Sequence, residues 1–170
     1  MLSDYNVRIR LGSLEQGVVN DELLEVILKM KNLCPHFHLS LQSGSATVLK
    51  RMNRHYTPEQ FLAVVQKIRK CFVNPAITTD VIVGFPGETE EDFLETMDVV
   101  GKVGYDSAFT FIYSKRSGTP AAKMENQVPE DVVKDRFDRL LALVQEKGRK
   151  ASSRFEGTVQ EILVEEESRE

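Results

Sequence analysis

The chain has 170 residues, of which 41% are hydrophobic and 28% charged, and its formal net charge is -4 at pH 7. This composition is globular and excludes disorder as the default, and the acidic balance excludes a generally basic nucleic-acid binder. No stretch is long and apolar enough to span a membrane, and the first residues lack a signal-peptide core. Two cysteines, Cys34 and Cys71, indicate reduced thiols rather than a disulfide framework, so we expect a cytoplasmic protein without membrane association.

Short apolar runs alternate with amphipathic stretches along the first half of the chain. Val7–Leu11 alternates apolar and basic residues, which predicts a strand. A helix capped by Asn20 follows, and His36–Leu41 predicts the second strand. Ser45 is positioned to cap a short helix. The segment TPEQF then predicts a capping box at Thr57 and the start of a longer helix.

The second half repeats this alternation. Ala76–Gly84 is a β-branched apolar run that predicts the third strand, and Thr89 starts the next helix with a capping-box pattern. Ser107–Tyr113 predicts the fourth strand, and a long amphipathic helix is expected from about Pro129 to Arg154. Gly157–Glu166 predicts one more strand, which falls outside the repeat.

Four strand–helix repeats with short connections are typical of an α/β protein with a parallel sheet. In such sheets, ligands bind on the loops that follow the carboxyl ends of the strands. Four loops of this kind combine glycine with hydroxyl or charged groups: GSLEQG, QSGS, GFPGET and SKRSGTP. We therefore expect a ligand site at this end of the sheet.

The turn after the third strand has two interpretations. Gly84 lacks a Cβ, so a flat ring could lie against its backbone, and the amides that start the following helix could bind an anion. Pro86 and Gly87 suit the central positions of a type II turn. The alternative is a tight connection between strand and helix that binds no ligand.

Two further loops carry candidate ligand groups. Gln42 has an amide that both donates and accepts, and with the Ser43 hydroxyl it suits a ribose or another polar ligand. Lys115 and Arg116 lie beside Tyr113, where two cations and an aromatic ring could meet a phosphate and a base. Such a pair of cations also occurs on an ordinary solvated surface.

Cys34, His36 and His38 are residue types that can bind a metal. Strand alternation places the two histidines on the same face, but no second pair of ligands lies nearby in the sequence. We therefore interpret all three as ordinary strand residues. The sequence contains no convincing nucleophile–base pair and no phosphate-binding P-loop.

Taken together, five segments resemble the radical S-adenosylmethionine (SAM) methylthiotransferases that modify tRNA. They are RIRLGSLE, PHFHLSLQSGS, RMNRHYT, ITTDVIVGFPGETEEDF and FIYSKRSGTPAAKM, in the order of that family. The segment GTVQEILVEE resembles the first strand of the small RNA-binding TRAM domain. The resemblance implies that residues 1–154 form the last four βα units of a partial (β/α) barrel, and that residues 155–170 begin a truncated TRAM-like domain.

The resemblance also implies an activity, the methylthiolation of C2 of a hypermodified adenosine at tRNA position 37. In this family one [4Fe–4S] cluster cleaves SAM to a 5′-deoxyadenosyl radical, and a second cluster supports sulfur insertion. The residues that the resemblance places near SAM are Gln42, Ser43, Asp80, Val83, Gly84 and Phe85. Those that it places on the tRNA side are Tyr113, Lys115 and Arg116.

Departures from the family pattern limit what this chain is expected to do alone. The C-x-x-x-C-x-x-C loop of the radical-generating cluster is absent, and Cys34 and Cys71 are too few and lie elsewhere. Asp80 and Gly87 stand where the superfamily's strand-five pattern has its first glycine and its glutamate. We therefore expect no metal ligand in this chain, assign no catalytic residue, and expect the chain alone to be inactive.

Several alternatives stay open at this stage. One is the branch that methylthiolates a ribosomal protein, although its version of YSKRSGTPAA tends to be acidic; another is an inactive fragment that binds RNA or a partner. The front half resembles enzymes that act on threonylcarbamoyl-adenosine, whereas the later segments resemble those that act on isopentenyl-adenosine.

An unpaired edge at the first strand is expected to lower stability or to promote self-association.

Overall fold

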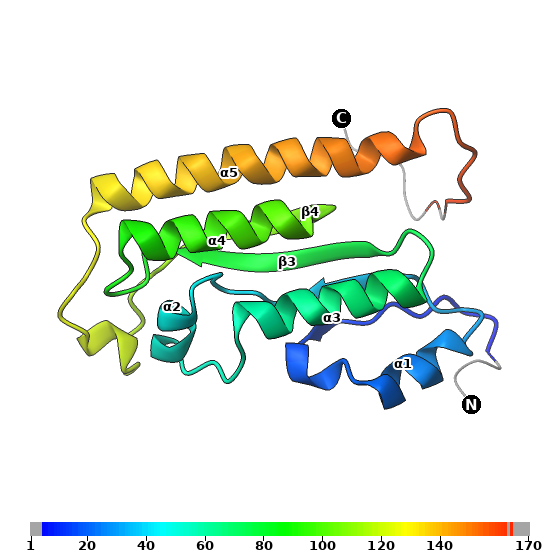
Figure 1. Ribbon diagram of the computed structural model, residues 1–170, viewed down its shortest axis with the longest axis horizontal. Coiled ribbons are helices and arrows are strands. Elements are labelled where there is room, and N and C mark those ends of the chain that lie inside the picture. Colours follow the sequence, from blue (N-terminus) through cyan, green and yellow to red (C-terminus); the bar gives the residue numbers. More distant parts are fainter. Residues whose placement is uncertain (1–4, 163, 165–170) are drawn as a thin grey trace.

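The fold is built on one parallel sheet. A computed structural model describes residues 5–162 and 164 of the chain. The sheet has four strands in the order β1-β2-β3-β4, and every neighbouring pair is parallel (Figure 1). The α/β fold with parallel strands that the sequence predicted is confirmed. The strands are β1 (Ser13–Leu14), β2 (His36–Leu39), β3 (Ala76–Val83) and β4 (Ser107–Ile112).

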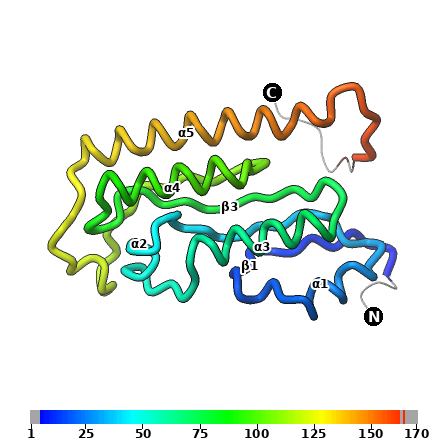
Figure 2. Tube along the Cα trace, viewed as in Figure 1, coloured from blue at the N-terminus to red at the C-terminus, as the bar shows by residue number. Residues whose placement is uncertain are grey.

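Helices connect the strands and follow one another across the sheet in chain order, so that α5 runs alongside α4 (Figures 1 and 2). Among the described residues, none of the helices is long and apolar enough to cross a membrane. The helices are α1 (Asp21–Leu28), α2 (Ala46–Arg51), α3 (Pro58–Cys71), α4 (Glu90–Val103) and α5 (Glu130–Ser152). Short 3₁₀ turns occur at η2 (Gln16–Val18), η3 (Ala121–Lys123) and η4 (Ser153–Phe155).

The helices bury one face of the sheet and leave the other accessible. Alternate β3 residues Ile77, Val81 and Val83 are fully buried, as a strand with one covered face requires. On the opposite face, Asp80 is half-buried and Phe109 of β4 is 57% exposed. The buried face packs against apolar side chains from four helices, among them Leu24, Ile27, Phe61, Ile68, Phe93, Val100, Val133 and Leu140.

Three predicted helix starts are confirmed. The Asn20 side chain accepts a hydrogen bond from Leu23, and Thr57 and Thr89 each close a capping box. Ser45 occupies the capping position of α2, but the cap that we predicted from its side chain is wrong. Its hydroxyl instead donates to Asp92 Oδ1 of α4 at 2.6 Å, a tertiary partner that the local sequence does not reveal, and its side chain makes no capping hydrogen bond to α2.

The position predicted for the first strand is wrong. β1 lies at Ser13–Leu14 rather than at Val7–Leu11, and Ile9 makes only an isolated bridge with Leu33. Ile9 pairs with Leu33, and Ser13 pairs with His38. The first segment advances four residues between these two pairs, whereas its partner segment advances five. This one-residue offset interrupts the hydrogen-bond ladder, so a regular strand cannot form across it.

The carboxyl-terminal part differs from the prediction beyond the long helix. The helix expected from about Pro129 to Arg154 is confirmed as α5, which continues into η4. The strand expected over Gly157–Glu166 is wrong where it can be tested, since residues 157–162 and 164 are irregular. The rest of that segment lies outside the described residues, so the TRAM-like domain stays a prediction.

A glycine in α4 offers a test of the helix assignment. A Cβ at Gly101 would meet nothing within 4 Å, and the residue lies inside the helix. We expect Gly101→Ala to raise the free energy of unfolding by about 0.5–1 kcal/mol, because alanine loses less backbone entropy on folding. Urea unfolding measures this. Gly104→Ala is the matched control: Gly104 ends the helix at a φ of 59°, so the same change there should destabilise. Equal effects at the two positions would contradict the helix boundary.

Candidate ligand site at the carboxyl ends of the strands

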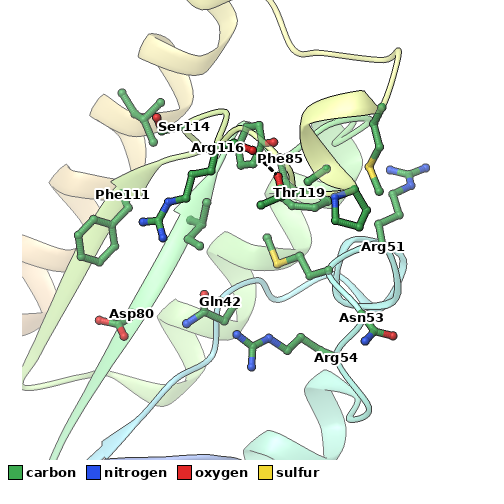
Figure 3. A pocket seen from close by; sticks show the side chains of 17 residues that line it. Gln42, Arg51, Asn53, Arg54, Asp80, Phe85, Phe111, Ser114, Arg116 and Thr119 are labelled. Carbon is green, nitrogen blue, oxygen red and sulfur yellow. Dashed lines mark hydrogen bonds between the residues drawn. The ribbon is translucent and has the colours of Figure 1, made fainter.

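A pocket of about 880 Å³ lies where β3 and β4 end (Figure 3). Its walls come from the segment after β2, the connection between α2 and α3, and the loop that follows β4. Of the nine predicted site residues, Gln42, Asp80, Phe85, Tyr113 and Arg116 line it. Ser43, Val83, Gly84 and Lys115 do not. The sequence analysis missed four residues that also line the pocket, all within the RMNRHYT segment, for which it predicted no ligand contact: Arg51, Met52, Asn53 and Arg54.

Gln42 is held in the pocket wall by its backbone. The predicted second strand ends early, at Leu39, and Gln42 then bridges to β3: its amide donates to Asp80 O and its carbonyl accepts from Ile82, both at 2.9 Å. Its φ is 63°, a left-handed conformation that is uncommon outside glycine. Such strain persists where the surroundings fix the residue, and it concentrates at functional sites. The side chain is directed into the pocket (Figure 3).

Ser43 anchors the same loop to α4 instead of facing the pocket. It is fully buried, its hydroxyl lies 3.2 Å from Thr96 Oγ1, and it accepts a hydrogen bond from the Ser45 amide. Next to it, a Cβ at Gly44 would lie 2.6 Å from Thr96 Cα, so only glycine permits this close approach. The structure therefore gives Ser43 a structural contact, and its predicted role near SAM stays a prediction.

The turn after β3 has the predicted type II geometry. Glu88 N donates to Phe85 O at 2.9 Å, and Gly87 has a φ of +78°. Gly84 also has a positive φ, +75°, and a Cβ there would lie 2.6 Å from Val133 Cγ2 of α5. Val133 thus supplies a packing reason for glycine at this position. Contact between Gly84 and a ligand ring stays a prediction.

A buried ion pair fastens this turn to α5, and the sequence reading missed it. Glu88 and Arg136 are only 6% and 4% exposed, with Arg136 Nη1 lying 2.9 Å from Glu88 Oε1. The same carboxylate oxygen accepts from Gly84 N at 3.0 Å. Burial raises the pKa of Glu88, while the Gly84 amide and the Arg136 guanidinium act in the opposite direction. Arg136 itself could have revealed this ion pair in the sequence, because a charged residue at this position shares the buried face of the helix with the apolar residues Val133 and Leu140.

Two aromatic rings form one wall of the pocket. Phe85 and Tyr113 meet edge to face, with centroids 5.2 Å apart and planes at 70°. The Tyr113 amide donates to Val83 O, which continues the pairing of β3 with β4. The Tyr113 hydroxyl is buried and has no hydrogen-bond partner within the described part of the chain. Phe111, half-exposed, extends the aromatic surface along β4.

The charged lining of the pocket is mainly cationic, consisting of three arginines and Asp80. Arg51 donates to Gly87 O and thereby supports the turn, while Arg54 pairs with Glu15 at 3.1 Å. Figure 3 shows Arg54 and Arg116 extending from opposite sides toward Gln42 and Asp80. An acidic chain thus places a local excess of positive charge where the strands end.

A second hollow, of about 520 Å³, lies on the accessible face of the sheet. His36 and His38 line it, and Asp80 and Phe111 line both hollows, so the two share one boundary. Both histidine rings are hydrogen-bonded to neighbouring strand residues, which agrees with the interpretation of His36 and His38 as strand residues. No group of three or more potential metal ligands occurs across residues 5–162 and 164.

Comparison with known sequences decides the family. Residues 5–100 match the family model of the radical SAM superfamily.

The chain belongs to the radical SAM superfamily.

Among its radical SAM relatives are three proteins named tRNA-2-methylthio-N(6)-dimethylallyladenosine synthase. The chain is 55% identical over 159 residues to the one from Lachnoclostridium phytofermentans, an alignment that covers 94% of this chain and 35% of the relative. Identity is 52% over 158 residues with the one from Clostridium botulinum strain Langeland, covering 93% and 35%. It is 48% over 162 residues with the one from Clostridioides difficile strain 630, covering 95% and 34%. The chain therefore spans about a third of the length of these relatives.

Solved structures show the same fold. Coproporphyrinogen III oxidase (HemN) from Escherichia coli, described as a radical SAM enzyme, matches with a TM-score of 0.69 at 18% identity, over 83% of this chain and 32% of its own. SuiB from Streptococcus suis, solved with the precursor peptide SuiA, matches with a TM-score of 0.52 at 12% identity, over 79% and 29%. At these identities the likeness concerns the fold alone, and it agrees with the predicted partial barrel.

Radical SAM proteins in general imply SAM and an iron–sulfur cluster. The residues of this chain do not fit the cluster: the only thiols are Cys34, half-buried, and Cys71, exposed, and the cluster takes at least three thiolates. The pocket residues do fit SAM. Amide and carboxylate groups, an aromatic pair and a buried hydroxyl without a partner match a nucleoside with a charged tail.

Proposed function

We propose that this chain forms part of the ligand-binding barrel of a tRNA methylthiotransferase, which adds a methylthio group to C2 of N6-dimethylallyl-adenosine at tRNA position 37. The observation that carries the proposal is convergence: five residues predicted from separate sequence segments line one pocket. The names of the relatives favour the dimethylallyl (isopentenyl) substrate over threonylcarbamoyl-adenosine. The basic loop around Lys115 and Arg116 favours tRNA over a ribosomal protein.

Each wall of the pocket has a proposed role. The Gln42 amide and the Asp80 carboxylate bind hydroxyl or amino groups of SAM, and the ring pair of Phe85 and Tyr113 flanks a flat ring. Arg116, with Lys115 on the same loop, neutralises phosphates of the tRNA. When bound, SAM supplies radical chemistry and the methyl group. The two thiols of this chain do not fit an iron–sulfur cluster, so its residues have no proposed role in holding one.

We further propose that residues 155–170 begin a TRAM-like RNA-binding domain, that the protein works in the cytoplasm, and that the short edge strand β1 supports self-association of the isolated chain. The chain alone is proposed to bind RNA without turnover, because Cys34 and Cys71 cannot supply three thiolates.

A chimera tests the proposed activity. This chain replaces the matching 159 residues in the relative from Lachnoclostridium phytofermentans. The chimera is produced in a host that lacks its own enzyme, and the tRNA nucleosides are analysed by mass spectrometry. We expect 2-methylthio-N6-dimethylallyladenosine to accumulate. A folded chimera with its iron–sulfur content intact that leaves only N6-dimethylallyladenosine would contradict the proposal, and a 2-methylthio-threonylcarbamoyl product would correct the substrate.

Arg116 gives a prediction for RNA binding. We expect Arg116→Gln to weaken binding of an anticodon stem-loop to the chimera about equally for different sequences. The slope of log K against log salt should become smaller by about one, as expected for the loss of one phosphate contact. Fluorescence anisotropy across a salt series measures both. Lys70→Gln removes the same charge from the exposed end of α3, away from the pocket, and should leave the slope unchanged.

A further inference from the structure

A row of polar side chains crosses the accessible face of the sheet and ends at the pocket. Arg10 Nε lies 3.2 Å from His36 Nδ1, and His36 Nε2 lies 3.1 Å from Thr78 Oγ1. The same hydroxyl lies 3.0 Å from His38 Nδ1, and His38 Nε2 lies 3.2 Å from Asp80 Oδ2. The parallel pairing of β2 with β3 creates the row, because it sets alternate residues of the two strands side by side.

The direction of the hydrogen bonds follows from the first link. Arg10 Nε–H can only donate, so His36 Nδ1 accepts and the proton of a neutral His36 sits on Nε2. Burial, Arg10 and His38 all lower the pKa of His36, which favours that neutral ring. Arg10 Nη2, which also can only donate, lies 3.3 Å from His36 Nε2, but the Asp80 carboxylate at the other end of the row can only accept from His38 Nε2 and agrees with the direction set by the shorter Nε–Nδ1 contact.

The remaining links then have one consistent arrangement. His36 Nε2–H donates to Thr78 Oγ1, so the single hydroxyl proton of Thr78 is free to donate to His38 Nδ1. His38 must then carry its own proton on Nε2, from which it donates to Asp80 Oδ2. Ser40 Oγ also donates to this oxygen, at 3.4 Å. Within the described chain, Asp80 Oδ1 has no hydrogen-bond partner, and Asp80 lines both hollows.

We propose that His38 is a positioning residue for Asp80. The row of hydrogen bonds through Arg10, His36 and Thr78 supports the Nε2–H tautomer of His38. In that form His38 holds the Asp80 carboxylate so that its Oδ1 atom can accept a hydrogen bond from a donor group of the nucleoside ligand. One oxygen of the carboxylate is engaged by the protein, and the other is left for the ligand. The ligand part of this inference rests on the proposed function, whereas the tautomer part does not.

The tautomer is tested on the 170-residue chain by a long-range ¹H–¹⁵N spectrum of its imidazole rings. The chain has three histidines, so single substitutions assign the signals. We expect the neutral ring of His36 and that of His38 each to be the Nε2–H tautomer. Thr78→Val removes the linking hydroxyl while keeping the shape, and should shift the His38 Nδ1 signal, because this nitrogen loses its hydrogen-bond donor. Thr78→Ser should restore the wild-type signal.

Thr110→Val on β4, outside this row, is the matched control and should leave the His38 signals unchanged. An Nδ1–H tautomer or an imidazolium at His38 in the folded wild-type chain would overturn the proposal. The same conclusion would follow if Thr78→Val kept the wild-type spectrum.

The consequence for Asp80 is tested in the chimera. Gln at position 38 can accept from Thr78 and donate to Asp80, whereas Leu can do neither. We expect His38→Leu to raise KM for SAM about tenfold with little change in kcat, and His38→Gln to restore most of the loss. Equal kinetics for the two variants would overturn the positioning role. If the unmodified chimera is inactive, the proposed function fails, and the imidazole spectrum still decides the inference.

Discussion

Arg136→Met lowers the free energy of unfolding of the chain by about 3–5 kcal/mol, the usual effect of breaking a buried ion pair from one side. Methionine keeps the packing of the long side chain but leaves the Glu88 carboxylate buried without its partner. It also removes the bonds from the guanidinium to Glu88 O and to Glu90 Oε2. Urea unfolding of the wild-type chain and the variant measures the loss.

The control for this prediction is Arg139→Met, one turn further along α5. Arg139 also contacts Glu90, but its side chain is 38% exposed, so its ion pairs are screened by water. We expect a loss of no more than about 1 kcal/mol there. Similar losses for both variants would mean that burial of the Glu88–Arg136 pair has no special effect.

The Arg136→Met deficit should also depend on pH. Burial raises the pKa of Glu88, so the folded chain holds this proton more tightly than the unfolded chain does. The stability that this adds is present at low pH and is lost as the pH rises through the folded-state pKa. Without Arg136 the pKa of Glu88 rises further. The deficit relative to wild type should therefore be smaller at about pH 5 than at about pH 8.

Gly84→Ala should destabilise the chain by about 2–4 kcal/mol, since it combines backbone strain with overpacking. The φ of Gly84 is +75°, and the new methyl group would lie 2.6 Å from Val133 Cγ2. Because α5 holds Val133 in place, the turn has to move. Thermal and urea unfolding should both show the loss, and the affinity for SAM of the corresponding chimera should fall with it.

Two companion variants separate the causes. Gly118 has a φ of +83°, and a methyl group added there would meet nothing within 4 Å, so Gly118→Ala reports backbone strain alone, at about 1 kcal/mol. Adding Val133→Ala to Gly84→Ala should recover the steric part of the loss, although it leaves a small cavity. If Gly84→Ala costs no more than Gly118→Ala, then Val133 is not the obstacle.

Local sequence signals predicted the parts of the fold that depend on neighbouring residues. The capping boxes at Thr57 and Thr89 and the turn at Gly87 were predictable because each involves residues only a few positions apart. The pocket was predictable in outline, because parallel strands bring their carboxyl ends together. Gln42 and Asp80 therefore meet although 37 other residues separate them.

The features that the sequence could not predict depend on distant partners. Arg136 forms an ion pair with Glu88 where α5 packs on the turn after β3. The Ser45 side chain donates to Asp92 of α4 instead of capping its own helix. The hydrogen-bond ladder is interrupted before Ser13 because of the register between two neighbouring segments. The alternation of apolar and polar residues within one segment does not encode that register. In each case the information lies in a tertiary contact rather than in a local pattern.

The bonds between the strand-end loops and α4 have a consequence for ligand affinity. Ser43 and Ser45 hold their loop to Thr96 and Asp92 of α4, and Asp92 also closes the cap of Thr89. The entropy of ordering these loops is therefore lost when the chain folds, and not when a ligand arrives. If a nucleoside binds as proposed, it meets a preorganised wall, so its binding should retain more of the favourable contact energy and should change the backbone order of these loops little.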